Sequence, residues 1–245
     1  MTDELRSLDG KLVLVTGASR GIGRAVAVAA AGAGAELLIT GRTIGALEEV
    51  DDEIKAANGT ATIVEMDMKD TTAIPRLAVA IMKRWGRLDG LVANAGMLPA
   101  LTPVAHLQPD VWDECLAVNL SGQWHLIKAM DPLLRNAPAG RAILVSSGAA
   151  LGSKPFWGPY AASKAGLEAL ARSWAGESEQ TNLRINILNP GATATTMRAS
   201  AYPGEDQATL PKPKDIVPAF LQLLSPDCVH HGALLDAREM LDLTV

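Results

Sequence analysis

The sequence predicts one α/β domain, spanning residues 1–245, in which helices flank both faces of a doubly wound, mostly parallel seven-stranded sheet. Short apolar segments alternate with helix-length segments along the chain, without a repeat or a linker. A glycine-rich turn joins the first apolar segment to the first helical one. Such alternation indicates parallel strands joined by right-handed helical crossovers, and the length suits one large domain with a substantial core.

The apolar segments are the predicted strands, because runs that are apolar at consecutive positions are typical of strands covered on both faces. They are residues 11–16, 36–40, 60–67, 88–93, 141–147, 183–189 and, as a short last strand, 233–235. The predicted helices are residues 21–33, 44–58, 71–85, 109–135, 160–181 and 214–225. Asn58-Gly59 predicts a helix end and Pro109-Asp110 a helix start. We expect the Pro-rich residues 202–214 to form a surface excursion within the same domain.

Composition and charge argue against several classes of partner. The formal net charge is −5, and no block of five or more like charges occurs, whereas a nucleic-acid-binding protein normally presents a basic surface. The longest apolar stretch, residues 25–39, contains two glycines and a glutamate. It is too short for a membrane span, which needs roughly 18 apolar residues. We therefore expect neither a nucleic acid nor a membrane as partner.

The two cysteines, Cys115 and Cys228, are too few for a disulfide framework or a cysteine-rich zinc site. They suit a reducing compartment, and the opening MTDELRSLDGK lacks the pattern of a signal peptide, so a cytoplasmic protein is expected. His230-His231 follows Cys228 and invites a metal-site interpretation. Further ligands at metal spacing are missing, so we expect a solvated loop there and no metal.

The glycine-rich turn is TGASRGIG, residues 16–23. Gly17, Gly21 and Gly23 allow a tight turn and a close approach of the backbone to a pyrophosphate, while the helix N-terminus offers free N–H groups to phosphates. The spacing differs from the usual G-x-G-x-x-G, and a purely structural turn is the alternative. The position between the first strand and the first helix favours a nucleotide site.

A second motif, YAASK, places Tyr160 and Lys164 one turn apart on one face of a predicted helix. A nearby ammonium favours phenolate, so Lys164 is expected to lower the pKa of Tyr160 and to make it a usable proton donor or acceptor. Ser147 stands at a strand end, where its hydroxyl would hold a substrate oxygen beside Tyr160. Asn119 would anchor a water leading to Lys164. Alone, the Tyr–Lys pair is more often a solvated pair on a helix surface.

Together these motifs resemble the short-chain dehydrogenase/reductase family over about residues 10–240. The matching features are the three glycines, ANAG at residues 93–96, Asn119, Ser147, the Tyr160–Lys164 pair and NPG at residues 189–191. ANAG replaces the more usual NNAG. Residues 189–206 resemble the YciK-type bacterial oxidoreductases within the family. The resemblance implies a Rossmann-type domain, a nicotinamide cofactor and hydride transfer at a carbonyl or alcohol carbon.

The resemblance also implies a role for each matching residue. Tyr160 is the implied acid or base, Lys164 adjusts its pKa and binds the ribose, Ser147 positions the substrate, and Asn119 supports the proton relay. The implied cofactor contacts are Gly17, Ser19, Arg20, Gly21, Ile22 and Gly23 in the glycine turn, Asp67 and Met68 at the adenine, Asn94, Ala95 and Gly96 at the adenosine ribose, Tyr160 and Lys164, and Pro190, Gly191, Thr193 and Thr195 at the nicotinamide.

The residues after the second predicted strand bear on the choice of cofactor. An NAD site usually has an acidic residue there for the ribose 2′-hydroxyl, but this chain has Gly41 followed by Arg42. A guanidinium makes forked, charge-assisted hydrogen bonds to a phosphate, and Arg20 would approach the same group. NADP(H) is therefore expected, with NAD(H) possible. The alternative is that Arg42 is an ordinary solvated residue before a helix.

Phe156 and Trp157 precede Tyr160 in a Gly/Pro-rich loop. They either pack within that loop or form one wall of a substrate pocket, with Met197 and Tyr202 opposite. We expect an NADP-dependent oxidoreductase acting on a small-molecule carbonyl or secondary alcohol, with carbonyl reduction favoured if the cofactor is NADPH. The alternatives are an NAD-dependent alcohol dehydrogenase and a cofactor-binding regulatory protein without turnover.

The predicted helices 109–135 and 160–181 carry more apolar side chains than one sheet face needs. Those side chains are Trp124, Leu126, Leu167, Leu170 and Trp174. Members of the resembled family commonly pair these two helices with their symmetry mates, and two-fold interfaces are the commonest in homo-oligomers. We expect a homodimer or a homotetramer.

Overall fold

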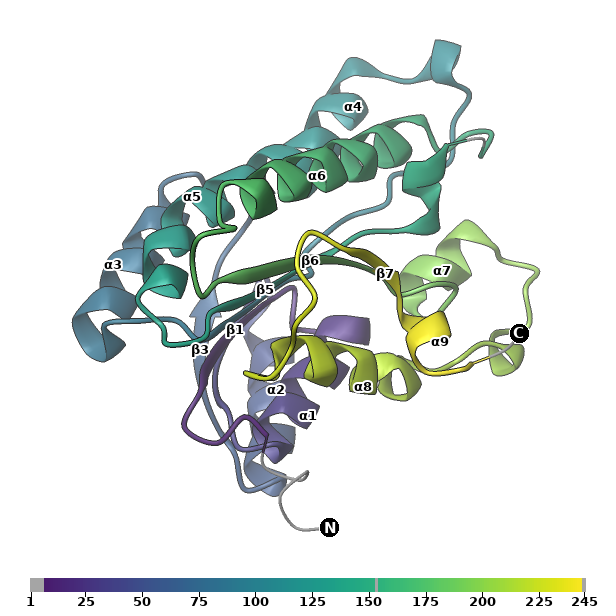
Figure 1. Cartoon of the computed structure of the whole chain (residues 1–245). Coiled ribbons are helices and arrows are strands. Elements are labelled where there is room, and N and C mark those ends of the chain that lie inside the picture. Colours follow the sequence, from purple (N-terminus) through teal and green to yellow (C-terminus); the bar gives the residue numbers. More distant parts are fainter. Residues whose placement is uncertain (1–6, 153, 244–245) are drawn as a thin grey trace.

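A computed structural model describes residues 7–152 and 154–243, and at its centre lies one sheet of seven parallel strands (Figure 1). The strands are β1 (Leu12–Thr16), β2 (Glu36–Gly41), β3 (Thr60–Glu65), β4 (Gly90–Ala93), β5 (Arg141–Val145), β6 (Arg184–Asn189) and β7 (Leu234–Asp236). Their order in the sheet is β3-β2-β1-β4-β5-β6-β7. The chain therefore reverses its direction of winding between β1 and β4, and ligands of open α/β sheets bind at the carboxyl ends of such strands.

Helices cover both faces of the sheet (Figure 1). On one face lie α1 (Gly21–Gly32), α2 (Ile44–Ala56) and α8 (Pro213–Leu224); on the other lie α3 (Ala73–Trp85), α4 (Pro109–Leu116), α5 (Gly122–Arg135) and α6 (Gly158–Gly176). The shorter helices are α7 (Thr196–Ala201), α9 (Ala237–Met240) and the single turns η2 (Val104–His106), η3 (Ala117–Ser121), η4 (Gly148–Leu151) and η5 (Gln207–Thr209). No helix among the described residues is both long enough and apolar enough to traverse a bilayer.

The apolar strand sequences follow from this double covering. Every residue of β1 is buried, and successive side chains of a strand point to opposite faces. Val13 and Val15 pack into the core beneath α1, α2 and α8, whereas Leu12 and Leu14 pack into the core beneath α3, α5 and α6. An alternating polar pattern would therefore bury polar groups on one face.

The predicted architecture is confirmed, and the sheet is parallel throughout the described strands. All seven predicted strands are present within three residues of the expected ends. The α2 helix stops before Asn58, which adopts a positive φ of 60°, and α4 starts at Pro109. Two strands end earlier than expected, β3 at Glu65 and β5 at Val145. This difference matters because it leaves Asp67 and Ser147 on loops at the carboxyl edge of the sheet.

The predicted helix 109–135 is not one regular helix. A π-helical turn, η3, separates α4 from α5 and contains Asn119. Gly122, the residue after this turn, packs closely on the backbone of the loop after β3, since a Cβ on it would lie only 2.6 Å from the Met68 carbonyl oxygen. Such turns occur mostly as single insertions at functional sites. The α7 helix, in the segment that follows β6, was not predicted from the sequence.

Candidate active site

The glycine turn brings β1 against the loop after β4. Gly17 and Gly21 have positive φ values of 65° and 58°. A Cβ on Gly23 would collide with the Gly17 carbonyl and with the Asn94 amide, and one on Gly17 would lie 2.8 Å from the Ala95 Cα. Only glycine fits this approach. The turn is therefore a cradle of bare backbone at the switch point of the sheet.

Hydrogen bonds from Thr16, which the sequence analysis had not singled out, fix this approach. Its Oγ1 accepts from the backbone N–H groups of Asn94 and Ala95 at 3.1 and 3.0 Å. In return, the Asn94 Nδ2 donates to the carbonyl oxygens of Thr16 and Gly17 at 2.9 and 3.2 Å. Two segments predicted to contact the cofactor, the glycine turn and Asn94–Ala95, are thus side by side. Gly96, next along, is exposed.

The edge of the site beyond β2 is basic. A Cβ on Gly41 would lie 3.4 Å from the Ser19 Cβ, so the glycine turn and the end of β2 adjoin. Arg20 and Arg42 are both exposed, and within residues 7–152 and 154–243 neither forms an ion pair. Asp67 lies after β3, where its carboxylate accepts from the Lys69 backbone N–H at 2.9 Å. This corner therefore offers two solvated guanidinium groups beside a backbone cradle.

The loop after β6 forms the facing side. Gly191 has a φ of 71°, and its N–H donates to the Asn189 Oδ1 at 3.1 Å. Thr193 is buried and donates to the Pro190 carbonyl at 3.3 Å. Thr195 caps α7 by accepting from the Arg198 N–H, and its methyl carbon would lie 3.6 Å from a Cβ on Gly21. The residues predicted to hold the nicotinamide therefore meet the glycine turn.

Tyr160 and Lys164 lie on α6, and both are buried. The Lys164 Nζ lies 5.8 Å from the centre of the Tyr160 ring and donates to the Val145 carbonyl at 2.7 Å. The Ser147 hydroxyl accepts from the Ala149 N–H at 3.2 Å, and Ser147 is close enough to Tyr160 to lower the pKa of its phenol. The sequence prediction that these three side chains come together agrees with the geometry.

Burial controls the protonation of this pair. It raises the pKa of Tyr160 to about 12, and the hydrogen bond with Ser147 offsets this in part. The expectation that Lys164 lowers the pKa of Tyr160 is therefore not met, because desolvation of the phenolate outweighs any attraction to the ammonium. Burial also lowers the pKa of Lys164 to about 8. At neutral pH Tyr160 is thus a neutral phenol, which is a proton donor.

Asn119 is fully buried, and its amide is engaged by protein. Its Oδ1 accepts from the Met97 N–H at 2.8 Å, and its Nδ2 donates to the Met97 carbonyl at 2.8 Å and to the Ser163 Oγ at 3.1 Å. Both amide protons are used by protein acceptors. The side chain joins the π-helical turn to the loop after β4 and to Ser163, the residue of α6 that precedes Lys164.

Aromatic side chains cover Tyr160 on the outer side. Trp157 is buried, with ring-centre distances of 5.7 Å to Tyr160 and 5.8 Å to Tyr202. Arg198 lies over the Tyr202 ring at 3.9 Å and donates to Glu205 at 2.6 Å. No sequence pattern predicts this ion pair, because its partners are seven residues apart, with Arg198 on α7 and Glu205 in the segment after it, and so share no helical periodicity.

The other two predicted pocket residues, Phe156 and Met197, are more exposed to solvent. Phe156 is 52% exposed with a φ of 74°, and Met197 is 38% exposed. Positive φ is uncommon for an aromatic residue and is often associated with functional loops. Phe156 and Met197 are therefore exposed, whereas Trp157 and Tyr202 pack on each other.

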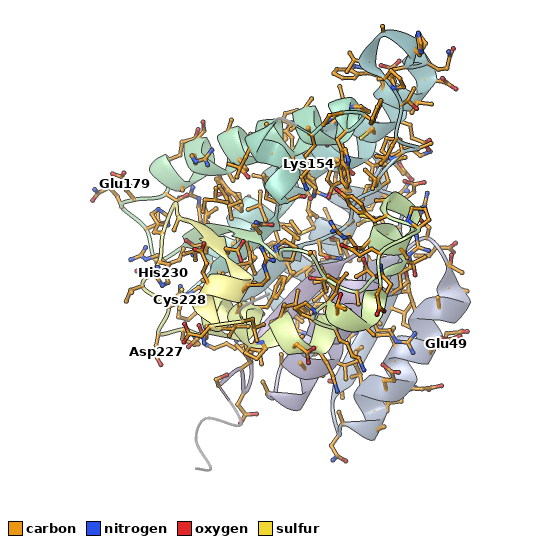
Figure 2. The ribbon with its side chains drawn as sticks, turned by 90° about the vertical axis from the view of Figure 1, so that its right-hand side faces the viewer. Glu49, Lys154, Glu179, Asp227, Cys228 and His230 are labelled. Carbon is orange, nitrogen blue, oxygen red and sulfur yellow. The ribbon has the colours of Figure 1, made fainter. Side chains whose placement is uncertain are left out.

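The cluster of Cys228, His230 and His231 lies away from the candidate active site. Figure 2 shows Asp227, Cys228 and His230 together, well away from Lys154, whose Nζ lies 5.2 Å from the Trp157 ring beside Tyr160. His231 is not solvated as expected, since its Nδ1 accepts from the Ile185 N–H at 3.2 Å and its Nε2 lies 2.9 Å from the Ala175 carbonyl. In the described part of the chain, no group of three or more His, Cys, Asp or Glu side chains is placed to hold a metal ion.

Comparison with known proteins agrees with this geometry. Residues 11–206 match the sequence model of the short chain dehydrogenase family. The oxidoreductase YciK of Escherichia coli is 37% identical over 223 residues, which is 90% of this chain and 88% of that protein. The solved structure of YciK superposes with a TM-score of 0.92 and covers 97% of this chain and 98% of that chain, at 36% identity.

Two other solved structures have the same TM-score of 0.92 and 35% identity. One is a short chain dehydrogenase from Shigella flexneri complexed with NADP, with 96% of this chain and 99% of that chain covered. The other is a short chain dehydrogenase from Escherichia coli complexed with NADPH, with 97% and 100% covered. The chain belongs to the short-chain dehydrogenase/reductase family of oxidoreductases, and the resemblance to its YciK-type members is confirmed.

The lowered pKa of Lys164 predicts a pH-dependent stability. Below pH 8 the lysine is charged in both the folded and the unfolded protein, and the shift from its ordinary value of 10.5 to about 8 corresponds to a cost of about 3 kcal/mol. Between these values the unfolded chain binds more protons, so the stability rises with pH. Lys164→Met removes this dependence.

We expect urea unfolding at pH 7 and pH 9.5 to show a gain in stability for the wild type that is smaller in Lys164→Met. Lys128→Met, which alters an exposed lysine of α5, controls for the loss of one charge. Identical pH dependence of the wild type and Lys164→Met would contradict the prediction.

Proposed function

We propose that the protein is an NADP-dependent oxidoreductase that transfers hydride between nicotinamide and a carbonyl or secondary alcohol. The observation that carries this proposal is the buried, neutral Tyr160, which lies beside Ser147 and Lys164 at the carboxyl edge of the sheet. The turn that contains Gly17 and Gly23 fits a pyrophosphate, because neither position has room for a side chain and the backbone is therefore bare. When bound, the nicotinamide supplies the hydride.

Tyr160 donates the proton. A carbonyl oxygen placed against its hydroxyl would accept that proton as negative charge develops on the oxygen. Ser147 already accepts a hydrogen bond from the Ala149 N–H, so its own proton is available to hold the same oxygen. Lys164 presents its ammonium at the inner side of Tyr160, where it stabilises negative charge and would hold the ribose. With its pKa raised to about 12, Tyr160 is protonated at neutral pH and can donate the proton that carbonyl reduction requires.

The mouth of the site favours a substrate with an apolar body. Leu151 at the end of η4, Phe156 in the loop before α6 and Met197 on α7 are 77%, 52% and 38% exposed. Such a group of exposed apolar side chains is typical of a ligand-binding surface. An NADPH-coupled screen of carbonyl compounds that differ in apolar size tests this proposal, and charged, short-chain ketones should be the poorest substrates.

The cofactor preference is supported by Arg20 and Arg42, which face solvent beside Gly41 where an acidic residue would serve NAD. The similar structures from Shigella flexneri and Escherichia coli hold NADP and NADPH. An NAD-dependent alcohol dehydrogenase is disfavoured, because this chain has Gly41 where such an enzyme would usually have a carboxylate. The alternative of a regulatory protein without turnover is disfavoured by the complete set of Ser147, Tyr160 and Lys164.

The first prediction from the proposed function concerns Tyr160→Phe. The change removes only the proton-donating oxygen from a side chain held by Trp157, so fold and NADPH affinity should persist while nearly all turnover is lost. Steady-state kinetics on the best carbonyl of the screen, with NADPH titration by fluorescence, measures both. A variant that keeps most of kcat would disprove the mechanism, and binding of NADPH without turnover in the wild type would support the regulatory alternative.

The second prediction concerns Arg42→Ala. Losing one charged hydrogen-bond partner costs about ten- to a hundred-fold in affinity, so NADPH binding should weaken by about that factor while NADH binding barely changes. Arg76→Ala, which alters an exposed arginine of α3, serves as the control. Equal losses for both cofactors, or a wild type that prefers NADH, would rule out the assignment of Arg42.

We also propose a homodimer or homotetramer that works in the cytoplasm. Part of the sequence argument fails, because Leu126, Leu167 and Trp174 are buried in the chain's own core. Trp112 and Trp124, on α4 and α5, remain 38% and 44% exposed and support an interface there. The free, buried Cys115 and Cys228 suit a reducing compartment.

The third prediction follows from this exposed tryptophan pair. Light scattering at micromolar concentration should give the mass of a dimer or tetramer, because two exposed indoles on neighbouring helices favour burial against a second copy. Trp124→Glu should lower that mass, whereas Val79→Glu, at an exposed position on α3, should not. A monomeric wild type would contradict the proposal.

A further inference from the structure

The proposed catalytic groups come from two separate elements. Ser147 follows β5, whereas Tyr160 and Lys164 belong to α6, and η4 lies between them in the chain. A displacement of about 1 Å between such groups is enough to cost a large part of the rate. The relative position of β5 and α6 is therefore a requirement of the proposed chemistry.

Two buried side-chain contacts join the end of β5 to α6. The Lys164 Nζ donates to the Val145 carbonyl at 2.7 Å, and the Ser146 Oγ donates to the Glu168 Oε1 at 2.6 Å. Ser146 is 2% and Glu168 is 6% exposed. The backbone N–H of Ser146 also donates to the Leu188 carbonyl at 2.9 Å, which holds the strand end to β6. Val145 and Ser146 immediately precede Ser147, so both contacts act on the segment that carries its hydroxyl.

The Lys164–Val145 contact and the Ser146–Glu168 contact differ in the other roles of the helix side chain. Under the proposed function Lys164 also serves Tyr160 and the ribose, so its ammonium is shared. Glu168 lies one turn further along α6 and touches none of the proposed reacting groups. Its second oxygen accepts from Arg172 at 3.0 Å, which fixes the rotation of the carboxylate. A buried carboxylate is costly unless its hydrogen bonds are satisfied, and this one is satisfied by Ser146 and Arg172.

We propose that Glu168 is a positioning residue that holds the end of β5 against α6 through Ser146, and so keeps the Ser147 hydroxyl beside Tyr160. This inference rests on the proposed function for its effect on turnover. The contact itself is a property of the folded chain. Glu168 follows Lys164 by four residues, as Lys164 follows Tyr160, so all three lie on one face of α6. This spacing is the one feature of the sequence that points to Glu168.

Kinetics provide one test. Ser146→Ala and Glu168→Ala should each lower kcat about tenfold, the effect of one buried hydrogen bond to a charged group, and leave the NADPH affinity unchanged. Glu168→Gln retains an oxygen acceptor for Ser146 and should recover most of kcat. Ser178→Ala removes another fully buried hydroxyl, which donates to the Trp174 carbonyl far from Ser147, and should leave kcat unchanged.

A double-mutant cycle separates positioning from general destabilisation. If Glu168 acts by placing Ser147, then Glu168→Ala should have little further effect in a Ser147→Ala background, because coupled residues are non-additive. Full additivity of the two substitutions would overturn the proposal, as would a Glu168→Gln variant as impaired as Glu168→Ala. Unchanged kcat in Ser146→Ala would do the same.

Amide hydrogen exchange gives a readout that needs neither cofactor nor turnover. The N–H groups of Ala149 and Ala150 donate to the Oγ and carbonyl of Ser147. Both should exchange faster in Ser146→Ala and Glu168→Ala, whereas Ala161, whose N–H donates to the Trp157 carbonyl at the start of α6, should not. Unchanged exchange at Ala149 and Ala150 would overturn the proposal. Failure of every carbonyl in the screen would refute the proposed function alone, because the exchange result does not depend on it.

Discussion

The close approach of the backbone of β1 to that of β4 is the constraint on which the site depends. Thr16 accepts two N–H groups from the loop after β4, and Asn94 returns two hydrogen bonds to the end of β1. Glycine at positions 17 and 23 is what permits these contacts, because a Cβ at either would meet the neighbouring backbone. The same bare backbone that satisfies the fold is the surface that fits a pyrophosphate, so the fold and the cofactor site share one physical cause.

Burial is the second determinant, and it acts on charge. The α6 helix lies over the sheet and carries Tyr160, Lys164 and Glu168 on its buried face. Burial raises the pKa of the Tyr160 phenol and lowers the pKa of the Lys164 ammonium, and both shifts arise because the charged form loses its hydration. The lysine finds one compensating partner in the Val145 carbonyl, and the glutamate finds two in Ser146 and Arg172. The polar groups of this helix therefore fasten it to the strand end that carries Ser147.

The polar interior of the site is arranged around three connections between elements. Asn119 joins the π-helical turn to Met97 and Ser163, Thr16 joins β1 to the loop after β4, and Glu168 joins α6 to β5. Each connection uses a side chain that does not itself meet the expected position of the substrate. The aromatic contacts of Trp157 with Tyr160 and Tyr202 close the outer side. A rigid surround of this kind keeps reacting groups in place without large movements of the backbone.

The sequence alone determined the seven strands and the glycine turn, because both rest on local patterns: apolar runs for strands covered on both faces, and glycines where the backbone must turn. A separation of four residues put Tyr160 and Lys164 on one helix face, while their expected role came from the resemblance to the family. The sequence also placed Ser147 and Asn94 at strand ends, where parallel strands present their carboxyl edges together. Only the tertiary structure decided the contacts of Asn119, the π-helical turn over Ala117–Ser121 and the hydrogen bonds of Thr16 and Glu168. It likewise reversed the expected shift in the pKa of Tyr160. These features depend on contacts between residues far apart in the chain and on how much water is excluded around them, and neither quantity is written in local spacing.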